Sequence, residues 1–200
     1  MRKNAPNARP PANAAPPATA GKKPRAAPGR SIAGCLEDRL PTMNIAIDTR
    51  WIFRNLSGIG VYTRELIRRL PGLDRRQRYT LLFDDPLVRD RTLAETGLAD
   101  APNVVSVLLP YGVFSVRSQL CLGRALAARG VRVFHSPNYL LPFPAFPRRG
   151  GRLRAVVTMH DVIPLALPDH APKSRKARVL PLFRRLLIEA VRRAQAVITI

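Results

Sequence analysis

The stretch 57–60 reads Ser-Gly-Ile-Gly and separates a short apolar run at 45–47 from a segment with helical spacing. Gly58 and Gly60 let the backbone approach a ligand closely, and the free N–H groups at the start of the following helix favour an anion. Ile59 lies between the two glycines in the same loop. The third glycine of the dinucleotide-binding fingerprint is missing. Two interpretations are therefore open, an anion-binding loop and a tight turn.

Other candidate site residues also come directly after apolar runs. Asp48 follows the first run, and His135 and Asn138 follow a later one. His160 and Asp161 follow the next. In a parallel sheet the ligand site lies beyond the carboxyl ends of the strands, where these residues would meet. Each residue alone also has a structural interpretation, as a cap, an interior histidine or a turn residue. Their shared location favours a common site.

The elements that must position these residues alternate along the chain. Six apolar runs, each short enough for a strand, are separated by helical or polar segments. They are residues 45–47, 79–83, 104–109, 131–134, 153–159 and 196–200. Near-continuous apolar strands between helices are typical of a parallel sheet covered on both faces. We therefore expect an α/β fold with a Rossmann-like, mostly parallel sheet and helices on both faces.

The helical segments have recognisable ends. The first helical segment should end at Pro71 and the glycine after it. A short helix is expected before Asp100. The segment 115–129 begins with a capping Ser115 and has Leu120, Leu122 and Leu126 inside. A basic helix is expected from about 173 to 193, with a kink or a later start at Pro181. Its apolar stripe fits packing on the sheet better than docking on a membrane.

The amino-acid composition limits the classes of function that this chain can have. The chain has 200 residues, 46% of them hydrophobic, which is enough for one domain. Its net charge of +21 suggests nucleic acid, anionic lipid or phosphorylated substrates. Cys35 and Cys121 form no disulfide framework or metal-ligand spacing, which fits a reducing cytoplasm. No apolar run is long enough to cross a bilayer.

Residues 1–42 differ from the rest. They hold 8 of the 20 prolines, no aromatic residue, and 8 basic against 2 acidic residues. Such a segment buries too little apolar surface to offset its ordering entropy, so we expect disorder. It could be a basic arm, a transit peptide or sequence that precedes the true start. The last is favoured because Met43 begins the first strand.

Several ordered motifs resemble glycosyltransferase family 4. They are MNIAIDTR at 43–50, SGIGVYTRELIRRL at 57–70, VFHSPNYLLP at 133–142, VVTMHDVIPLALP at 156–168 and AQAVITI at 194–200. Residues 43–200 resemble the amino-terminal half of the family's GT-B fold. This half shapes the acceptor site, while a second half holds most of the nucleotide.

The resemblance implies a retaining transfer of sugar from a nucleotide-sugar donor to an acceptor, with no metal and no cofactor beyond that co-substrate. By position, His160 would lie beside the donor sugar as the catalytic residue. The glycine loop would lie near the donor phosphates and the acceptor, where it offers donors to developing charge. The substrate-binding residues would be Asp48, Gly58, Ile59, Gly60, Asn138 and Asp161.

The second GT-B domain is missing from this sequence, so we expect the chain alone to transfer no sugar. The acceptor would be an envelope or polysaccharide precursor, either a sugar or lipid-linked. The basic surplus suits a cytoplasmic protein with peripheral contact to an anionic membrane. One alternative is a non-catalytic basic module that binds nucleic acid or anionic membrane, although no nucleic-acid motif is present. Another is a truncated, inactive product.

Overall fold

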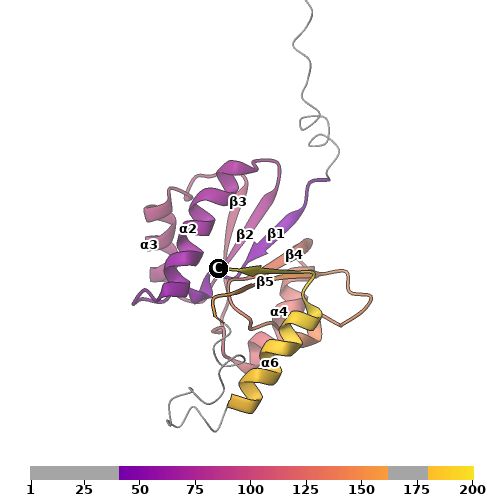
Figure 1. The fold of residues 1–200 in the computed structure, drawn as a ribbon. Coiled ribbons are helices and arrows are strands. Elements are labelled where there is room, and N and C mark those ends of the chain that lie inside the picture. The colour runs from indigo at the N-terminus through magenta and orange to yellow at the C-terminus, as the bar shows by residue number, and fades with distance from the viewer. Residues whose placement is uncertain (1–40, 162–179) are drawn as a thin grey trace, which may run out of the picture. The chain divides into compact units, whose positions relative to one another are not determined.

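The computed structural model describes residues 41–161 and 180–200, and in them a six-stranded parallel sheet has the order β3-β2-β1-β4-β5-β6 (Figure 1). The strands are β1 (Asn44–Ile47), β2 (Arg78–Phe83), β3 (Val104–Leu108), β4 (Val131–Ser136), β5 (Arg154–Met159) and β6 (Ala196–Thr199). Every neighbouring pair is parallel. The strand order reverses between β1 and β4, and such a switch point opens a crevice at the carboxyl ends of the strands. The predicted Rossmann-like α/β fold is confirmed.

Helices lie on both faces of this sheet. Helices α2 (Gly58–Leu73) and α3 (Pro86–Thr96) lie on one face, and α4 (Val116–Ala127) and α6 (Leu180–Arg193) on the other (Figure 1). Two short 3-10 turns, η1 (Thr49–Trp51) and η2 (Phe143–Ala145), complete the described elements. Each face has its own buried cluster, with Ile67 of α2 in one and Leu126 of α4 in the other.

Capping residues fix where the helices begin, as the sequence predicted for α4. The Ser115 hydroxyl accepts a hydrogen bond from the Ser118 N–H at 3.1 Å. The short helix expected before Asp100 is α3, whose cap Asp85 accepts from the Leu87 N–H at 2.9 Å. These caps satisfy N–H groups that have no partner inside a helix. Helices α3 and α4 therefore begin at these caps, after the carboxyl ends of β2 and β3.

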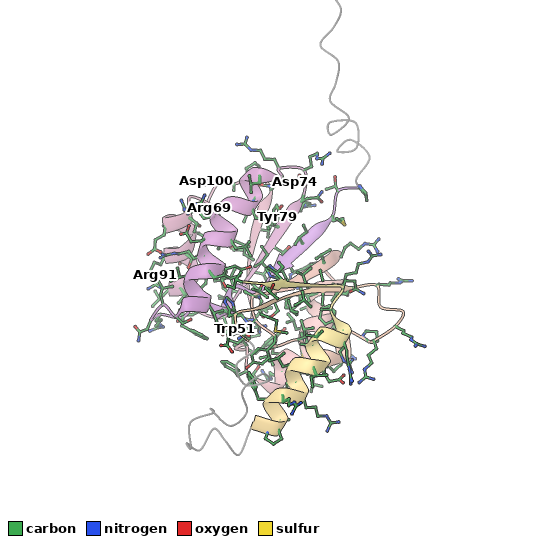
Figure 2. The ribbon with its side chains drawn as sticks, in the orientation of Figure 1. Trp51, Arg69, Asp74, Tyr79, Arg91 and Asp100 are labelled. Atoms are coloured by element: carbon green, nitrogen blue, oxygen red, sulfur yellow. The ribbon has the colours of Figure 1, made fainter. Side chains whose placement is uncertain are left out.

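The first helix continues past its predicted end, so the expected stop at Pro71 is wrong. Helix α2 includes Pro71 and ends at Leu73. A proline in the last turn removes only one intrahelical hydrogen bond, and the Asp74 N–H still donates to the Leu70 carbonyl at 3.2 Å. The Asn103 amide donates to the Pro71 carbonyl at 3.0 Å. Asp74, labelled in Figure 2, is the capping residue at this end of α2.

One expectation about packing is corrected. Leu122 and Leu126 of α4 are buried, but Leu120 is 64% exposed because it faces away from the sheet. At the edge of the sheet beyond β5, the four residues of β6 are exposed. The described part of α6 begins at Leu180, so its predicted start at 173 lies outside the described residues, as do Cys35 and nearly all of the tail predicted at 1–42.

Candidate functional site

The carboxyl ends of β1, β4 and β5 lie side by side and bring most of the predicted site residues to one edge. Ile47 of β1 pairs with His135 of β4, and the next N–H, that of Asp48, donates to the His135 carbonyl at 3.0 Å. His135 in turn pairs with Val156 of β5. This edge is the switch point of the sheet, where the fold places a ligand crevice.

His160 follows β5 and is half-buried between β4 and α2. Its Nε2 lies 2.8 Å from the carbonyl oxygen of Pro137, in the loop after β4. A carbonyl can only accept, so Nε2 carries the hydrogen and Nδ1 is the acceptor nitrogen of the ring. Within the described residues no hydrogen bond reaches Nδ1. The ring of Tyr62 meets the imidazole edge-on, with 5.1 Å between centroids. These contacts fix the ring at the edge of the sheet.

A buried hydroxyl, that of Thr158, joins His135 to α2. Thr158 Oγ1 lies 2.9 Å from His135 Nε2 and 3.1 Å from the Tyr62 hydroxyl. Burial lowers the pKa of His135 to about 4. His135 is therefore neutral at pH 7 and serves as an interior hydrogen-bonding residue. Of the two candidate histidines, His135 is buried and His160 is half-buried.

The glycine loop forms the first turn of α2. The Ser57 hydroxyl accepts from the Gly60 N–H at 3.2 Å, whereas the N–H groups of Gly58 and Ile59 have no acceptor among the described residues. Unpaired N–H groups at a helix start attract anions. Tyr62 lies one turn further along the helix and contacts His160. The structure thus brings the glycine loop and His160 to the same place.

Gly58 and Gly60 differ in the space around their α-carbons, and this difference leads to a prediction. A Cβ at Gly60 would lie 3.2 Å from the Trp51 carbonyl oxygen, while a Cβ at Gly58 meets nothing within 4 Å. We expect Gly60→Ala to lower the free energy of unfolding by about 1 kcal/mol, since backbone must move to accept it. Gly58→Ala should leave it unchanged or slightly raised. Urea unfolding of both variants checks this, and equal stabilities would contradict it.

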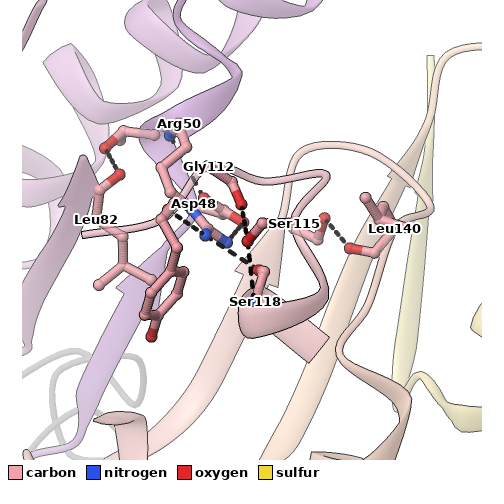
Figure 3. A network of polar contacts seen from close by, with 10 residues as sticks. Asp48, Arg50, Leu82, Gly112, Ser115, Ser118 and Leu140 are labelled. Atoms are coloured by element: carbon pink, nitrogen blue, oxygen red, sulfur yellow. Dashed lines mark hydrogen bonds and ion pairs between the residues drawn. The ribbon is translucent and has the colours of Figure 1, made fainter. Parts of the chain in front are cut away.

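Asp48 lies in a buried ion pair (Figure 3). Asp48 and Arg50 are each 1% exposed, and the guanidinium binds both carboxylate oxygens, at 2.7 Å and 2.8 Å. Arg50 also donates to the Ser118 hydroxyl at 3.1 Å. Burial opposes the charge of Arg50, but Asp48 and Asp84 more than offset it and raise its pKa. The predicted contact of Asp48 with substrate stays a prediction, because here both oxygens are bound to Arg50.

The remaining predicted residues lie on the loops after β4 and β5. Asn138 is 7% exposed, and its Oδ1 accepts from the Tyr139 N–H at 2.7 Å, which folds the loop back on itself. Asp161 is exposed beside this loop. Burial raises the pKa of Tyr139, and the charge of Asp161 raises it further. Asn138 therefore shapes the loop whose Pro137 carbonyl holds His160.

Three residues that position this edge were missed from the sequence. Arg50 is two residues from Asp48, and no known sequence motif is defined by that spacing. Thr158 reads as an ordinary strand residue inside an apolar run. Tyr62 could have been found, since it follows Gly58 by four residues and so lies above it on the helix. An aromatic residue at that position predicts a contact beside the glycine loop.

The opposite edge of the sheet has a different character. A hollow of about 590 Å³ lies at the amino ends of β1, β4 and β5, and Arg132, Arg152 and Arg154 line it. Among the described residues, no three His, Cys, Asp or Glu side chains are grouped as metal ligands. In the same ranges, no helix is both long and apolar enough to span a membrane.

Comparison with known proteins supplies a family for this arrangement. A family model described as a glycosyl transferase 4-like domain matches residues 57–200. The match covers the glycine loop, the loop after β4 and the His160 segment. A search of curated proteins found no match.

Proposed function

Because the chain belongs to the glycosyl transferase 4-like family, we propose that it forms the acceptor-side half of a retaining glycosyltransferase. The enzyme would move a sugar from a nucleotide-sugar to an envelope or polysaccharide acceptor. The observation that carries the proposal is the contact of His160 with Tyr62 and Pro137, which joins β5, α2 and β4 at the switch point. A ligand there would meet the glycine loop and an imidazole together.

The described groups suit the developing charges of sugar transfer. The bond between the anomeric carbon and the donor phosphate breaks, so negative charge grows on the phosphate. The N–H groups of Gly58 and Ile59 would face that charge from the helix start, where a fixed dipole stabilises an anion. His160 Nδ1 would accept a hydrogen bond from a sugar hydroxyl and orient the donor sugar. A second GT-B domain would face this edge and hold the nucleotide.

Replacing His160 tests this role. In a protein that carries both GT-B halves, His160→Ala should lower kcat/KM by about 100-fold, as loss of a transition-state contact does. His160→Gln offers an amide N–H for the Pro137 carbonyl but no ring nitrogen, and it should lose activity while keeping the unfolding midpoint. A normal kcat/KM in either variant would show that His160 has no part in transfer.

The chain by itself should behave differently from the two-domain protein. We propose that the 200-residue polypeptide transfers no sugar, because the nucleotide-binding half is the second domain. Incubation of the purified chain with nucleotide-sugars and candidate acceptors should give no product by mass spectrometry. Product from any of them would overturn this proposal. The proposed site of action is the cytoplasmic face of the membrane, with a lipid-linked acceptor and an arginine-rich protein in peripheral contact with anionic lipid.

A further inference from the structure

Three exposed arginine side chains gather at the amino ends of the strands, at the opposite edge of the sheet from His160. Arg132 belongs to β4, Arg154 begins β5, and Arg152 lies in the loop just before β5. All three line the hollow of about 590 Å³ at this edge. We call them the arginine cluster. The proposed sugar transfer involves none of them, because it takes place at the carboxyl edge.

The arginine cluster lacks the carboxylate partners that other arginines of this protein have. Arg148, in the same loop as Arg152, is bound to Glu189 of α6. Among the described residues, the side chains of the cluster form no hydrogen bond or ion pair. The described residues that line the hollow include no aspartate or glutamate. Like charges in one concavity repel one another, and a bound anion relieves that repulsion.

A β-bulge positions two members of the cluster. After Asn44 the register between β1 and β4 shifts by one residue, so Arg132 has no partner on β1. Such a bulge re-aims a side chain at the end of a strand. Val133, the next residue of β4, pairs with Arg154 of β5. The bulge therefore lies beside the first residue of β5, and the two arginines come from neighbouring strands.

A tight loop brings the third member to the same hollow. Gly150 has a φ of 76°, a left-handed conformation that favours glycine. A Cβ on Gly151 would lie 3.3 Å from the Cδ of Pro147. The loop therefore folds back on itself directly before Arg152, and Gly151 lines the hollow beside that residue.

A second hollow, of about 440 Å³, adjoins the first, and Arg132 and Arg152 line both. Its other lining residues are small or apolar: Gly123, Ala127, Gly130, Val131, Ala145 and Leu153. Each volume lies in the range of sites that bind small molecules. The two hollows together have room for a ligand whose anionic part meets the arginine cluster and whose remainder lies against α4.

The lining residues favour a soluble phosphorylated ligand over a nucleic acid or a membrane. Neither hollow is lined by a described aromatic residue, so the bases of a single strand would find no stacking partner. None of the large apolar side chains exposed in the described ranges lines either hollow, so none is there to enter a bilayer. Guanidinium groups bind phosphate oxygens through paired hydrogen bonds, and a diphosphate brings several charges into a small volume.

We propose that the arginine cluster binds a small, soluble anion that carries a diphosphate group. Inorganic pyrophosphate is the simplest member of this class. The inference does not rest on the proposed function, since the cluster lies at the amino ends of the strands and the glycine loop follows a carboxyl end. The protein would thus have a second anion site, separate from the one proposed for the donor phosphates.

Titration calorimetry of the whole chain with inorganic pyrophosphate, at about 0.15 M salt, tests the proposal. Pyrophosphate should bind one site, and Arg132→Gln, Arg152→Gln and Arg154→Gln should each weaken binding by about tenfold, as loss of a charge-assisted hydrogen bond does. Arg117→Gln removes the same charge from an exposed position on α4, after the carboxyl end of β3, and should weaken binding by less than about twofold. Circular dichroism should show all four variants folded. Equal losses in the four would indicate general charge attraction and overturn the proposal.

Nuclear magnetic resonance locates the bound anion. The Nε–H signals of the arginine cluster should shift on addition of pyrophosphate, and the amide signals of Gly58 and Ile59 should shift less. Shifts at the glycine loop alone would place the anion at the proposed donor site and overturn the inference. Neither measurement involves sugar transfer, so this inference can fail while the proposed function stands, and the reverse is equally distinguishable.

Three other ligands test the class of anion. Citrate carries three carboxylates and should bind more weakly than pyrophosphate, whereas equal affinity would mean that charge alone is recognised and would reject a diphosphate site. A single-stranded RNA oligonucleotide and phosphatidylglycerol vesicles represent the polymer and the membrane. If either binds with the same losses in the arginine variants while pyrophosphate does not bind, the cluster serves that partner and the proposal fails.

Discussion

Replacing Asp48 with asparagine is expected to lower the free energy of unfolding by about 3–5 kcal/mol, among the largest losses for a single substitution. The change keeps the shape of the side chain but leaves the Arg50 charge buried without its counter-ion. Arg50 is 1% exposed, so water cannot replace the carboxylate. The neutral amide offers one acceptor oxygen, whereas the guanidinium binds both oxygens of the carboxylate. Urea unfolding followed by circular dichroism measures the loss.

A double variant distinguishes a stranded charge from a loss of packing. Adding Arg50→Met to Asp48→Asn removes the buried cation and keeps much of its volume. The double variant should be more stable than Asp48→Asn alone. Replacing both members of a buried ion pair costs less stability than leaving one buried charge without its partner. If the double variant is the less stable, the charge is not what Asp48 contributes. A loss below about 1 kcal/mol for Asp48→Asn would refute the prediction outright.

Stability should also fall with acid between about pH 6.5 and about pH 4, through His135. Burial keeps His135 neutral in the fold, with a pKa of about 4, whereas the unfolded chain takes up a proton near pH 6.5. The unfolded state therefore binds more protons in this range. The contribution of His135 is complete above pH 6.5 and disappears toward pH 4, a change of about 3 kcal/mol. Urea unfolding at about pH 7.5 and about pH 4.5 should reveal it.

The control for this pH dependence is His135→Gln. Glutamine can still bond to the Thr158 hydroxyl but does not titrate, so the slope between these two pH values should become shallower. A residual slope is expected from carboxylates such as Glu189, whose pKa is lowered by its hydrogen bonds to Arg148 and Arg193. An identical slope in the variant and in the original chain would assign the acid sensitivity to other groups.

The fold and the place of the candidate site were predictable from local patterns. Apolar runs such as 79–83 became parallel strands because a sheet buried on both faces requires apolar residues at successive positions. Strand direction then put Asp48, Asn138 and His160 at one edge. The stop expected at Pro71 was misplaced because a tertiary hydrogen bond from Asn103 satisfies the carbonyl there. Leu120 was misjudged because residues two apart on a helix point to nearly opposite sides, so Leu120 cannot share the buried face of Leu122 and Leu126.

The sequence by itself determined the order of strands and helices, the glycine loop at the start of α2, and the surplus of arginine. Those features depend on spacing, turn chemistry and charge, which act between residues close in the chain. Only the tertiary structure decided that Arg50 binds both oxygens of the Asp48 carboxylate, and that Trp51 is buried beneath an exposed Phe114. It also decided that His135 is buried and neutral, whereas His160 is half-buried against Tyr62. Each of these depends on which distant side chains meet, because burial sets the pKa of an imidazole and the partner of a buried charge.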